Sequence, residues 1–433
     1  MGQDHQGSEY QVELGGTAIH VICRRYTATG SRVGGRKDLK VNDAVSNGPL
    51  DRVRVLDFTN MLSGPYCTRL LADLGAEVIK VEPPAGDHNR HRRPVRKGYS
   101  SFFGHLNCGK KSIVLDLKCD VGRSAAIELA AKSDVLVENW RPGVAARLGL
   151  GYDAVARVSP RIIFCSISGF GQQGPNAQRP AYAPILHAAS GYDLAQVEYQ
   201  GGGRPLNSAV YVADILGGMS AFAAIQTALF HRQQTGRGQY IDVALMDCML
   251  NLMINEFQEA QAPSDVKQRV YQPLETSNGY IVTAPTSQRN FEQLAQAVGH
   301  SEWLTDPRFA KTPTREAYWS EFMNAIEEWT RTRTSERCER KLVEAGVPCT
   351  RYKTVAEAMA DPHIEQRGVL ARVRDGAGEY WVPNAPFQMP GLNTKARPHV
   401  PTLGEYTVEI LTGLLGYSIS QAHGCSGNTV KPI

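Results

Sequence analysis

The chain has 433 residues, 42% of them hydrophobic, which is enough for a large buried core and for two domains. Its formal net charge of +4 is small for that length and gives no support for nucleic acid as a partner. The nine cysteines include no CxxC pair, so we expect free thiols in a reducing, cytoplasmic setting and no zinc site or other metal site. No apolar run approaches the roughly 18 residues of a membrane span, so no membrane contact is expected.

Residues 1–50 are rich in Gly, Ser, Asp and Arg and contain one short apolar run, Thr17 to Cys23. This composition predicts a poorly ordered N-terminal extension. Its arginines would suit a transit peptide, but Asp4, Glu9 and Glu13 argue against one.

Residues 51–262 alternate between strand-like apolar runs and helical stretches. The expected strands lie at 53–58, 76–82, 112–117, 135–139, 162–168 and 240–245. Strands separated by helical stretches predict βαβ units, and hence a large α/β domain with a Rossmann-like parallel sheet. Ligands of such sheets bind beyond the carboxyl ends of the strands. The loops that follow the strands are therefore the candidate binding loops: 59–65, 83–100, 139–143 and 169–180.

One of these loops, at 83–100, is strongly basic. It contains Arg90, Arg92, Arg93, Arg96 and Lys97, and Lys110 and Lys111 follow closely. Such a run is either a solvated face or, at the ligand edge of a parallel sheet, a set of cations for phosphate groups. The sequence leaves both possibilities open.

The segment Val137–Gly143 ends a predicted strand in a polar, aromatic turn. Trp140 could stack on a ring, while Arg141 and Arg147 could hold anionic groups. By contrast, the G-x-G-x-x-G match at Gly169–Gly174 is a weak signal for a dinucleotide. Prolines interrupt the residues after it and several strands precede it, so a nicotinamide-dependent oxidoreductase is disfavoured.

The stretch Asn207–Gly218 contains the strongest candidate for a catalytic group. Its apolar residues 209–213 predict a strand, and the residues after Gly217 and Gly218 have helical spacing, so Asp214 is expected where a strand gives way to a helix. The positive end of the helix dipole would favour its ionised form. The two glycines would let another molecule approach the backbone. Taken alone, an aspartate before a helix is more often an ordinary N-cap than a catalytic group.

Beyond a linker-like shift near Pro263, residues 263–385 predict a smaller α+β domain with a hairpin through 375–378. Residues 386–417 are expected to return to the large domain through a helix at 405–415. Residues 418–433 have the composition of a frayed tail.

Taken in order, the motifs resemble one family, the class III (CaiB/BaiF) coenzyme A transferases. The resemblance runs from about Leu50 to Thr407. It rests on the segments VLDFTNMLSGPYCTRLLADLGAEVIKVEPPAGD (55–87), NCGKKSIVLDLK (107–118), DVLVENWRPGVAARLGLGY (134–152), VADILGG (212–218), TGRGQYIDVALMD (235–247) and PTLGEYT (401–407).

This resemblance implies that Asp214 is a nucleophile, which attacks an acyl-CoA to give an acyl-aspartyl anhydride and then an aspartyl-CoA thioester. It implies CoA contacts at Leu62, Ser63, Leu115, Asp116, Leu117, Lys118, Asn139, Trp140, Arg141, Arg147, Tyr182 and Ala183. Acyl-CoA would be a substrate, with no tightly bound cofactor, and the chain would form an interlocked homodimer. The arginines near the site suggest a dicarboxylate acceptor.

Two alternatives share the same CoA site. An α-methylacyl-CoA racemase of this family would need a histidine where this chain has Tyr182, and a tyrosine is too weak an acid to replace it easily near neutral pH. His187 lies one helical turn further on and is expected to be an ordinary packed histidine. The third possibility is a non-catalytic CoA-binding protein.

Overall fold

A computed structural model describes residues 9–14, 17–22, 48–205, 207–264 and 269–427. The chain divides into two units, residues 1–46 and 47–433. In the first, strands β1 (Glu9–Leu14) and β2 (Thr17–Ile22) pair antiparallel. The expectation of a poorly ordered extension therefore does not hold for these strands, and for the remainder of residues 1–47 it lies outside the described residues.

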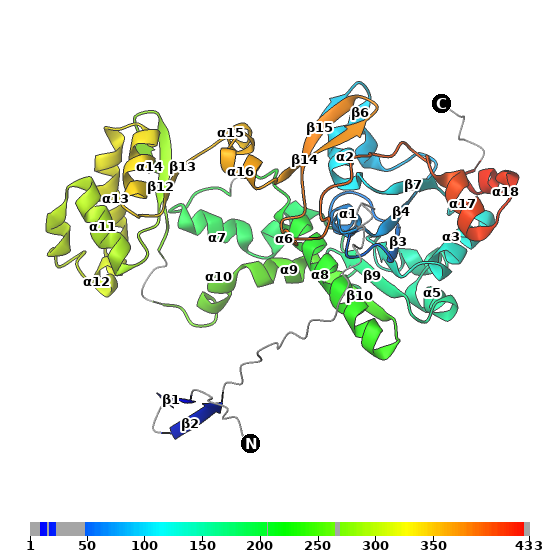
Figure 1. The fold of residues 1–433 in the computed structure, drawn as a ribbon, viewed down its shortest axis with the longest axis horizontal. Helices are drawn as coiled ribbons and strands as arrows, with labels where there is room; N and C mark the ends of the chain where they lie inside the picture. The colour runs from blue at the N-terminus through cyan, green and yellow to red at the C-terminus, as the bar shows by residue number, and fades with distance from the viewer. Residues whose placement is uncertain (1–8, 15–16, 23–47, 206, 265–268, 428–433) are drawn as a thin grey trace, which may run out of the picture. The chain divides into compact units, whose positions relative to one another are not determined.

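The second unit is built on a six-stranded parallel sheet, which confirms the predicted α/β class (Figure 1). Its strands are β3 (Arg54–Asp57), β4 (Glu77–Glu82), β7 (Lys111–Val114), β8 (Val135–Glu138), β9 (Ile163–Ser168) and β10 (Gln239–Ala244). They pair in the order β10-β9-β8-β3-β4-β7. Because the first and fourth strands along the chain are neighbours, the winding reverses between β3 and β8. In open parallel sheets this reversal point is where ligands bind.

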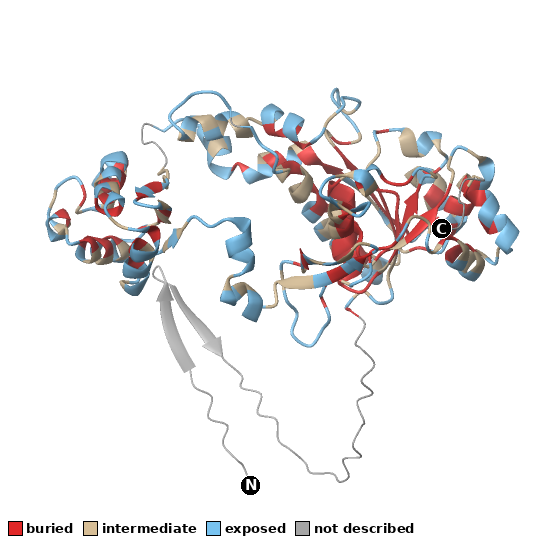
Figure 2. Ribbon diagram, turned by 90° about the horizontal axis from the view of Figure 1, so that it is seen from above, coloured by how far each residue is buried: buried red, intermediate tan, exposed pale blue. Residues whose placement is uncertain are grey.

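Alternate residues of each strand face opposite sides of the sheet and enter two separate hydrophobic clusters. Val55 and Val135 pack beneath one layer of helices, whereas Leu56 and Leu136 pack beneath the other. Figure 2 shows the buried residues concentrated on the sheet and on the helix faces turned toward it.

The first helical layer is formed by α1 (Ser63–Asp73), α6 (Ala183–Ala189), α8 (Val212–Thr235) and α9 (Leu245–Leu252). The second is formed by α3 (Asp120–Ala131), α5 (Tyr152–Val158), α17 (Thr407–Leu415) and α18 (Ile419–Cys425). Residues 407–415, which the sequence assigned to a segment returning to the large domain, form α17 in this layer. The predicted fraying beyond residue 418 is wrong as far as Cys425, because Ala422 and Cys425 are fully buried against this layer.

Helix α8 is long and apolar enough to cross a membrane by length and composition, which corrects the statement that no such run exists. In this structure it is the central helix of the first layer. A Cβ on Gly218 would lie 2.6 Å from the Ser63 carbonyl oxygen, and one on Gly217 would lie 2.1 Å from Leu245 Cδ2. The two glycines therefore allow close packing of α8 on α1 and α9, and not the approach of a ligand as the sequence suggested.

The remaining elements of the large domain are short and lie in the connections. They are η1 (His88–His91), β5 (Val95–Arg96), β6 (Tyr99–Ser100), α2 (Ser101–Asn107), α4 (Val144–Arg147), α7 (Tyr192–Tyr199) and α10 (Ile254–Glu259).

A separate aromatic-rich core is formed between residues 274 and 347. Its sheet has the order β11 (Leu274–Thr276), β12 (Gly279–Thr283) and β13 (Cys349–Arg351). Its helices are α11 (Gln288–Val298), η2 (Ser301–Leu304), α12 (Thr312–Ala317), α13 (Trp319–Arg331) and α14 (Ser335–Glu344).

After this core come α15 (Val355–Met359), α16 (Pro362–Gln366) and the predicted hairpin, β14 (Leu370–Asp375) and β15 (Gly378–Pro383). The hairpin packs on the large domain: Val373 and Val382 share a hydrophobic cluster with Phe103 of α2. Its position brings residues of β15 close to α2.

Candidate active site

Asp214 lies in the first turn of α8, which begins at Val212. Residues 209–211 form no strand, and Tyr211 occupies the N-cap position without a side-chain capping bond. The predicted junction of strand and helix is therefore wrong in its strand, and Asp214 is not an N-cap. Its carboxylate instead lines a cavity of about 290 Å³.

The electrostatic expectation for Asp214 is also corrected. Burial raises the pKa of its carboxyl to about 6, while the positive charge of Arg92 acts in the opposite direction. The expectation from the sequence rested on the helix dipole alone, which would lower the pKa of Asp214. Loss of water around the charged form outweighs that local effect here.

Arg92 is held near Asp214 by two aromatic rings. Its guanidinium carbon lies 4.1 Å from the centroid of the Phe102 ring and 5.2 Å from that of Tyr211. Stacking of this kind orients a planar cation without neutralising it. Arg92 thus supplies a positive charge near Asp214, a role that could not be distinguished from phosphate binding in the sequence.

The Asp214 cavity opens at the point where the winding of the sheet reverses. Asn60, after β3, and Asn139, after β8, both line it. The Asn60 backbone N–H donates to Asn139 Oδ1 at 2.9 Å, and Asn139 Nδ2 donates to the Asn60 carbonyl at 2.7 Å. This reciprocal pair ties the two loops together across the two central strands.

Met61 is the strained residue of the site. It lines the cavity and has φ of 63°, a left-handed conformation that unbranched non-glycine residues rarely adopt. The side-chain amide of the buried Asn89 donates to its carbonyl and holds this conformation. Backbone strain of this kind concentrates at functional sites, where the surrounding structure maintains it.

A second cavity of about 450 Å³ shares three lining residues with the first: Asn60, His88 and Trp140. The predicted CoA-contact residues Leu115, Asp116, Leu117 and Lys118 line this second cavity. The two cavities are therefore neighbours at the ligand edge of the sheet. His88 joins them and was not singled out from the sequence, although it lies in a predicted binding loop.

Trp140 sits where the two cavities meet. Its ring packs against Phe58 with centroids 5.3 Å apart, and its backbone N–H donates to Glu138 Oε2 at 2.8 Å. Burial raises the pKa of Glu138 to about 7, against the effects of the Ser166 and Trp140 hydrogen bonds. Glu138 therefore fixes the turn that presents Trp140.

Of the other predicted site residues, some line the Asp214 cavity and others lie outside it. Ser63, Arg141 and Tyr182 line the Asp214 cavity. Ala183 is fully buried in the core, Arg147 is exposed on α4 outside both cavities, and Leu62 lines a different cavity. Arg179, which was not predicted from the sequence, also lines the Asp214 cavity, and its guanidinium lies over the Phe170 ring.

Most of the basic loop is engaged within the protein, so the idea of a phosphate cluster there is wrong for these residues. Arg90 pairs with Glu82 at 2.6 Å, and Arg96 pairs with Asp375 at 2.9 Å. Lys110 is completely buried against Asp57. Their partners lie far away in sequence or inside the core, where composition gives no indication of them.

His187 has the packed role expected for it. It is 1% exposed, and its Nε2 accepts the backbone N–H of Ala213 at 3.2 Å. Burial lowers its pKa, so the ring stays neutral and acts as an acceptor. It braces the start of α8 beside Asp214 but is not among the residues that line the cavity.

The Gly169–Gly174 motif does not open a helix. Gly171 and Gly174 have φ of 85° and 94°, and the next helix, α6, begins only at Ala183. A dinucleotide fingerprint requires a helix N-terminus directly after the glycines, so the motif is a turn. Across the described residues, no group of three or more His, Cys, Asp or Glu is placed to hold a metal ion.

Comparison with known proteins shows the family of the chain. Residues 50–407 match the model of CoA-transferase family III. An acetyl-CoA:oxalate CoA-transferase of Acetobacter aceti is 34% identical, covering 84% of this chain and 95% of the relative. A succinyl-CoA–D-citramalate CoA-transferase of Chloroflexus aurantiacus is 33% identical, covering 85% and 94% respectively. The crystal structure of a CaiB/BaiF family protein from Brucella suis superposes with a TM-score of 0.74 at 32% identity, over 85% of this chain and 100% of that one. The chain is therefore a member of CoA-transferase family III, the class III or CaiB/BaiF CoA-transferases.

Proposed function

We propose that the protein transfers CoA from an acyl-CoA to a carboxylic acid through covalent intermediates on Asp214. The observation that carries this proposal is a partly buried carboxylate near a cation, in a cavity that shares lining residues with a second, larger one. The names of the relatives, which include transferases for oxalate and D-citramalate, support the reaction class.

The proposed reaction divides into exchanges at acyl carbon. Asp214 attacks the thioester carbonyl, the CoA thiolate leaves, and an acyl-aspartyl anhydride forms. The thiolate then attacks the aspartyl carbonyl of that anhydride, which releases the first acid and leaves an aspartyl-CoA thioester. The acceptor carboxylate repeats these two steps in reverse and regenerates Asp214. No net proton is taken up or released.

Three features of the site favour these steps. Partial burial of Asp214 removes water that would solvate and weaken the nucleophile and would hydrolyse the anhydride. The Arg92 charge keeps the carboxylate available and can stabilise negative charge that develops on the carbonyl oxygen. For CoA we propose the 450 Å³ cavity, with Trp140 near the acyl end and Lys118 near the phosphate-bearing end.

A racemase remains the alternative within the family, and Tyr182 and His187 speak against it. Tyr182 is 61% exposed. The Nε2 atom of His187 already accepts a hydrogen bond from the backbone N–H of Ala213. Incubation with a chiral 2-methylacyl-CoA in deuterated water tests this point. Deuterium entering the α-carbon without any added acid would support the racemase and contradict the transferase.

The transferase itself is tested by supplying acetyl-CoA or succinyl-CoA with a panel of carboxylic acids and detecting new CoA thioesters by mass spectrometry. We expect a new thioester whose formation depends on both the donor and the acid. Binding of CoA without turnover of any donor would instead indicate a non-catalytic CoA-binding protein.

We also propose a homodimer, interlocked as the family resemblance implies. Large apolar side chains such as Leu194, Ile254 and Val355 are 65%, 71% and 78% exposed. Exposed groups of this kind are typical of surfaces that a second chain covers. Light scattering of the purified protein should give twice the chain mass.

The acid limb of the pH profile should depend on Arg92. With the Asp214 pKa at about 6, kcat/KM should rise as pH increases through 6, because only the carboxylate is nucleophilic. Arg92→Gln removes the charge that lowers this pKa, so the limb should move to higher pH by about one unit. Arg92→Lys should restore much of the position of the limb, and Arg93→Gln, at an exposed neighbour, should not move it. Equal loss of activity at every pH would contradict this role.

A further inference from the structure

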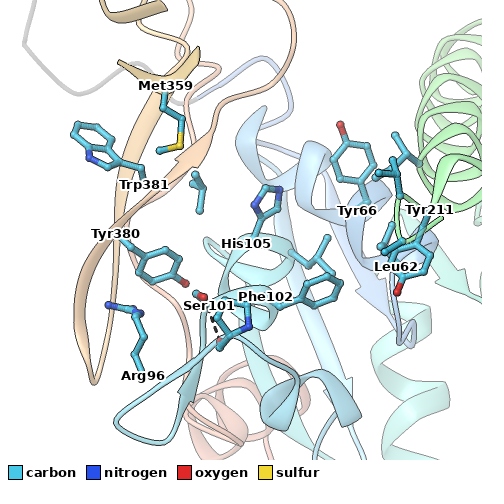
Figure 3. A pocket seen from close by; sticks show the side chains of 16 residues that line it. Leu62, Tyr66, Arg96, Ser101, Phe102, His105, Tyr211, Met359, Tyr380 and Trp381 are labelled. Atoms are coloured by element: carbon cyan, nitrogen blue, oxygen red, sulfur yellow. Dashed lines mark hydrogen bonds between the residues drawn. The ribbon is translucent and has the colours of Figure 1, made fainter. Parts of the chain in front are cut away.

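A third cavity, of about 730 Å³, lies on the other side of the first turn of α8 (Figure 3). It is more than twice the volume of the Asp214 cavity and falls in the range of small-molecule sites, roughly 300 to 1,000 Å³. The site proposed above for CoA does not include it.

This cavity adjoins the nucleophile through shared elements. Tyr211 and Ile215 line it and stand on either side of Asp214 along α8. Leu62 lines it between Met61 and Ser63, which both line the Asp214 cavity. A molecule whose carboxyl group reached Asp214 could therefore extend into this space.

Arg92 lies close to both cavities, although it is a lining residue of neither. Its guanidinium lies over Phe102 and Tyr211, which both line the larger cavity, while its charge acts on Asp214 in the smaller one. A carboxylate held at Arg92 would point its remaining atoms along these rings.

The lining of the larger cavity is mainly aromatic and aliphatic. Its five aromatic rings other than histidine come from four segments that are distant in sequence: Tyr66 of α1, Phe102 of α2, Tyr211 before α8, and Tyr380 and Trp381 of β15. Figure 3 shows Tyr380 and Trp381 on one side, Tyr66 and Tyr211 on the other, and His105 and Phe102 between them. Such walls recognise a flat or branched apolar body through burial and ring packing.

The cavity offers a second carboxylate two polar groups but no unpaired charge. Arg96 is ion-paired with Asp375, with its Nη2 at 2.9 and 3.1 Å from the two carboxylate oxygens, and it stacks on Tyr380 at 4.3 Å, while the Arg96 Nε and the Tyr380 hydroxyl have no hydrogen-bond partner among the described residues. Burial, with the nearby Arg69 charge, lowers the pKa of His105 to about 4, so this ring is uncharged near neutral pH. These two are the basic side chains that line the cavity. A buried carboxylate without a cation partner would be strongly disfavoured.

We infer that this cavity binds the body of one of the exchanged acids, and that this acid is a monocarboxylate with an aryl or branched alkyl body. The inference rests on the proposed transferase function and replaces the dicarboxylate suggested by the sequence. The carboxyl group lies at Arg92 and Asp214, and the apolar body passes over Phe102 toward Trp381.

The first test measures acid preference with the full-length wild-type protein. With acetyl-CoA as donor, kcat/KM is determined for phenylacetate, cinnamate and isovalerate, and for succinate and oxalate. We expect kcat/KM for the best apolar acid to exceed kcat/KM for both dicarboxylates by at least about tenfold, because the apolar acid buries several more apolar groups. A preference for succinate or oxalate would overturn the inference.

The second test fills the cavity. Ala209 is exposed in the loop before α8 and lines the cavity, so Ala209→Trp reduces its volume without altering the core. With succinyl-CoA as donor, so that transfer to acetate gives a distinct product, the ratio of kcat/KM for phenylacetate to that for acetate should fall at least about tenfold. Ala262→Trp, at an exposed position outside the cavity, is the matched control and should leave the ratio unchanged.

The outcomes separate the two proposals. If no acid accepts CoA from any donor, the transferase function fails. If small acids accept CoA and Ala209→Trp leaves the acid ratio unchanged, only the inference about the cavity fails. A change of oligomeric state in Ala209→Trp, by light scattering, with an unchanged acid ratio would show that a second copy of the chain fills the cavity, and would also overturn the inference.

Discussion

Replacing Asp214 with asparagine should lower kcat by at least about 1,000-fold, because an amide is a far poorer nucleophile than a carboxylate and no other route to the covalent intermediate exists in the proposed mechanism. The loss should be seen in kcat at saturating acyl-CoA, with the Kd for CoA little changed, because Asp214 lies away from the cavity assigned to the nucleotide. The mass of the variant must be checked, since deamidation would regenerate aspartate.

Stability measurements distinguish this chemical role from a structural one. The Asp214 pKa is about 6 in the folded protein against an ordinary value of 3.8, so between these pH values the unfolded chain has lost a proton that the folded protein retains. The protonated group therefore contributes stability at low pH that is lost as pH rises through 6. At pH 7 the asparagine variant should unfold at the same temperature as wild type or higher. A large drop in its unfolding temperature would mean that Asp214 supports the fold.

The second large effect is expected on stability, at Lys110. Its Nζ donates to Asp57 Oδ2 at 3.0 Å, to the Pro65 carbonyl at 3.0 Å and to Thr68 Oγ1 at 2.8 Å, and both charged side chains are 0% exposed. Burial tends to raise the pKa of Asp57, but Lys110 and Lys80 together hold it below its usual value. The pair joins the end of β3 to the start of α1 beneath the active-site loop.

Lys110→Met should leave Asp57 buried without this partner and lower the free energy of unfolding by about 3–5 kcal/mol, measured by urea denaturation. Lys111→Met is the matched control. Lys111 is paired at the surface with Glu77 and Glu409, and its loss should cost no more than about 1 kcal/mol.

A double variant shows whether the buried charge is the cause. Adding Asp57→Asn to Lys110→Met removes the unpaired charge and should recover part of the lost stability. Equal effects of Lys110→Met and Lys111→Met would contradict the account of this network.

The sheet could be predicted from the sequence because its strands are buried on both faces and therefore form nearly continuous apolar runs. All six predicted strand segments became strands of the parallel sheet. The rule that ligands bind beyond the carboxyl ends then led to the loops carrying Asn60, His88 and Asn139. The order of the strands, and with it the reversal between β3 and β8, depends on contacts between distant segments that periodicity does not reveal.

The environment of Asp214 could not be predicted, because its burial and its proximity to Arg92 depend on segments that are distant from the helix end in sequence. The basic loop failed as a prediction for the same reason: the partner of Arg96 is Asp375, 279 residues away in sequence. The helix at 419–425 was missed despite a readable signal. Ser418 and Gln421 have capping-box spacing, and both capping bonds are present.

The larger apolar cavity illustrates the same limit. Its walls come from α1, α2, the loop before α8, and β15. No single sequence motif therefore predicts its size or its polarity. Two of the arginines that suggested a dicarboxylate, Arg90 and Arg96, are paired with carboxylates of the protein itself. Charge counted along a sequence overestimates the charge that a ligand meets.

The central claim is that Asp214 becomes covalently activated during turnover, and trapping the intermediate tests it most directly. Wild-type protein is mixed with an acyl-CoA donor, treated with hydroxylamine, digested and analysed by mass spectrometry. The account predicts a hydroxamate on Asp214, which depends on the donor and is missing in Asp214→Asn. An unmodified Asp214 in protein that is turning over, or a hydroxamate on another carboxylate, would contradict it.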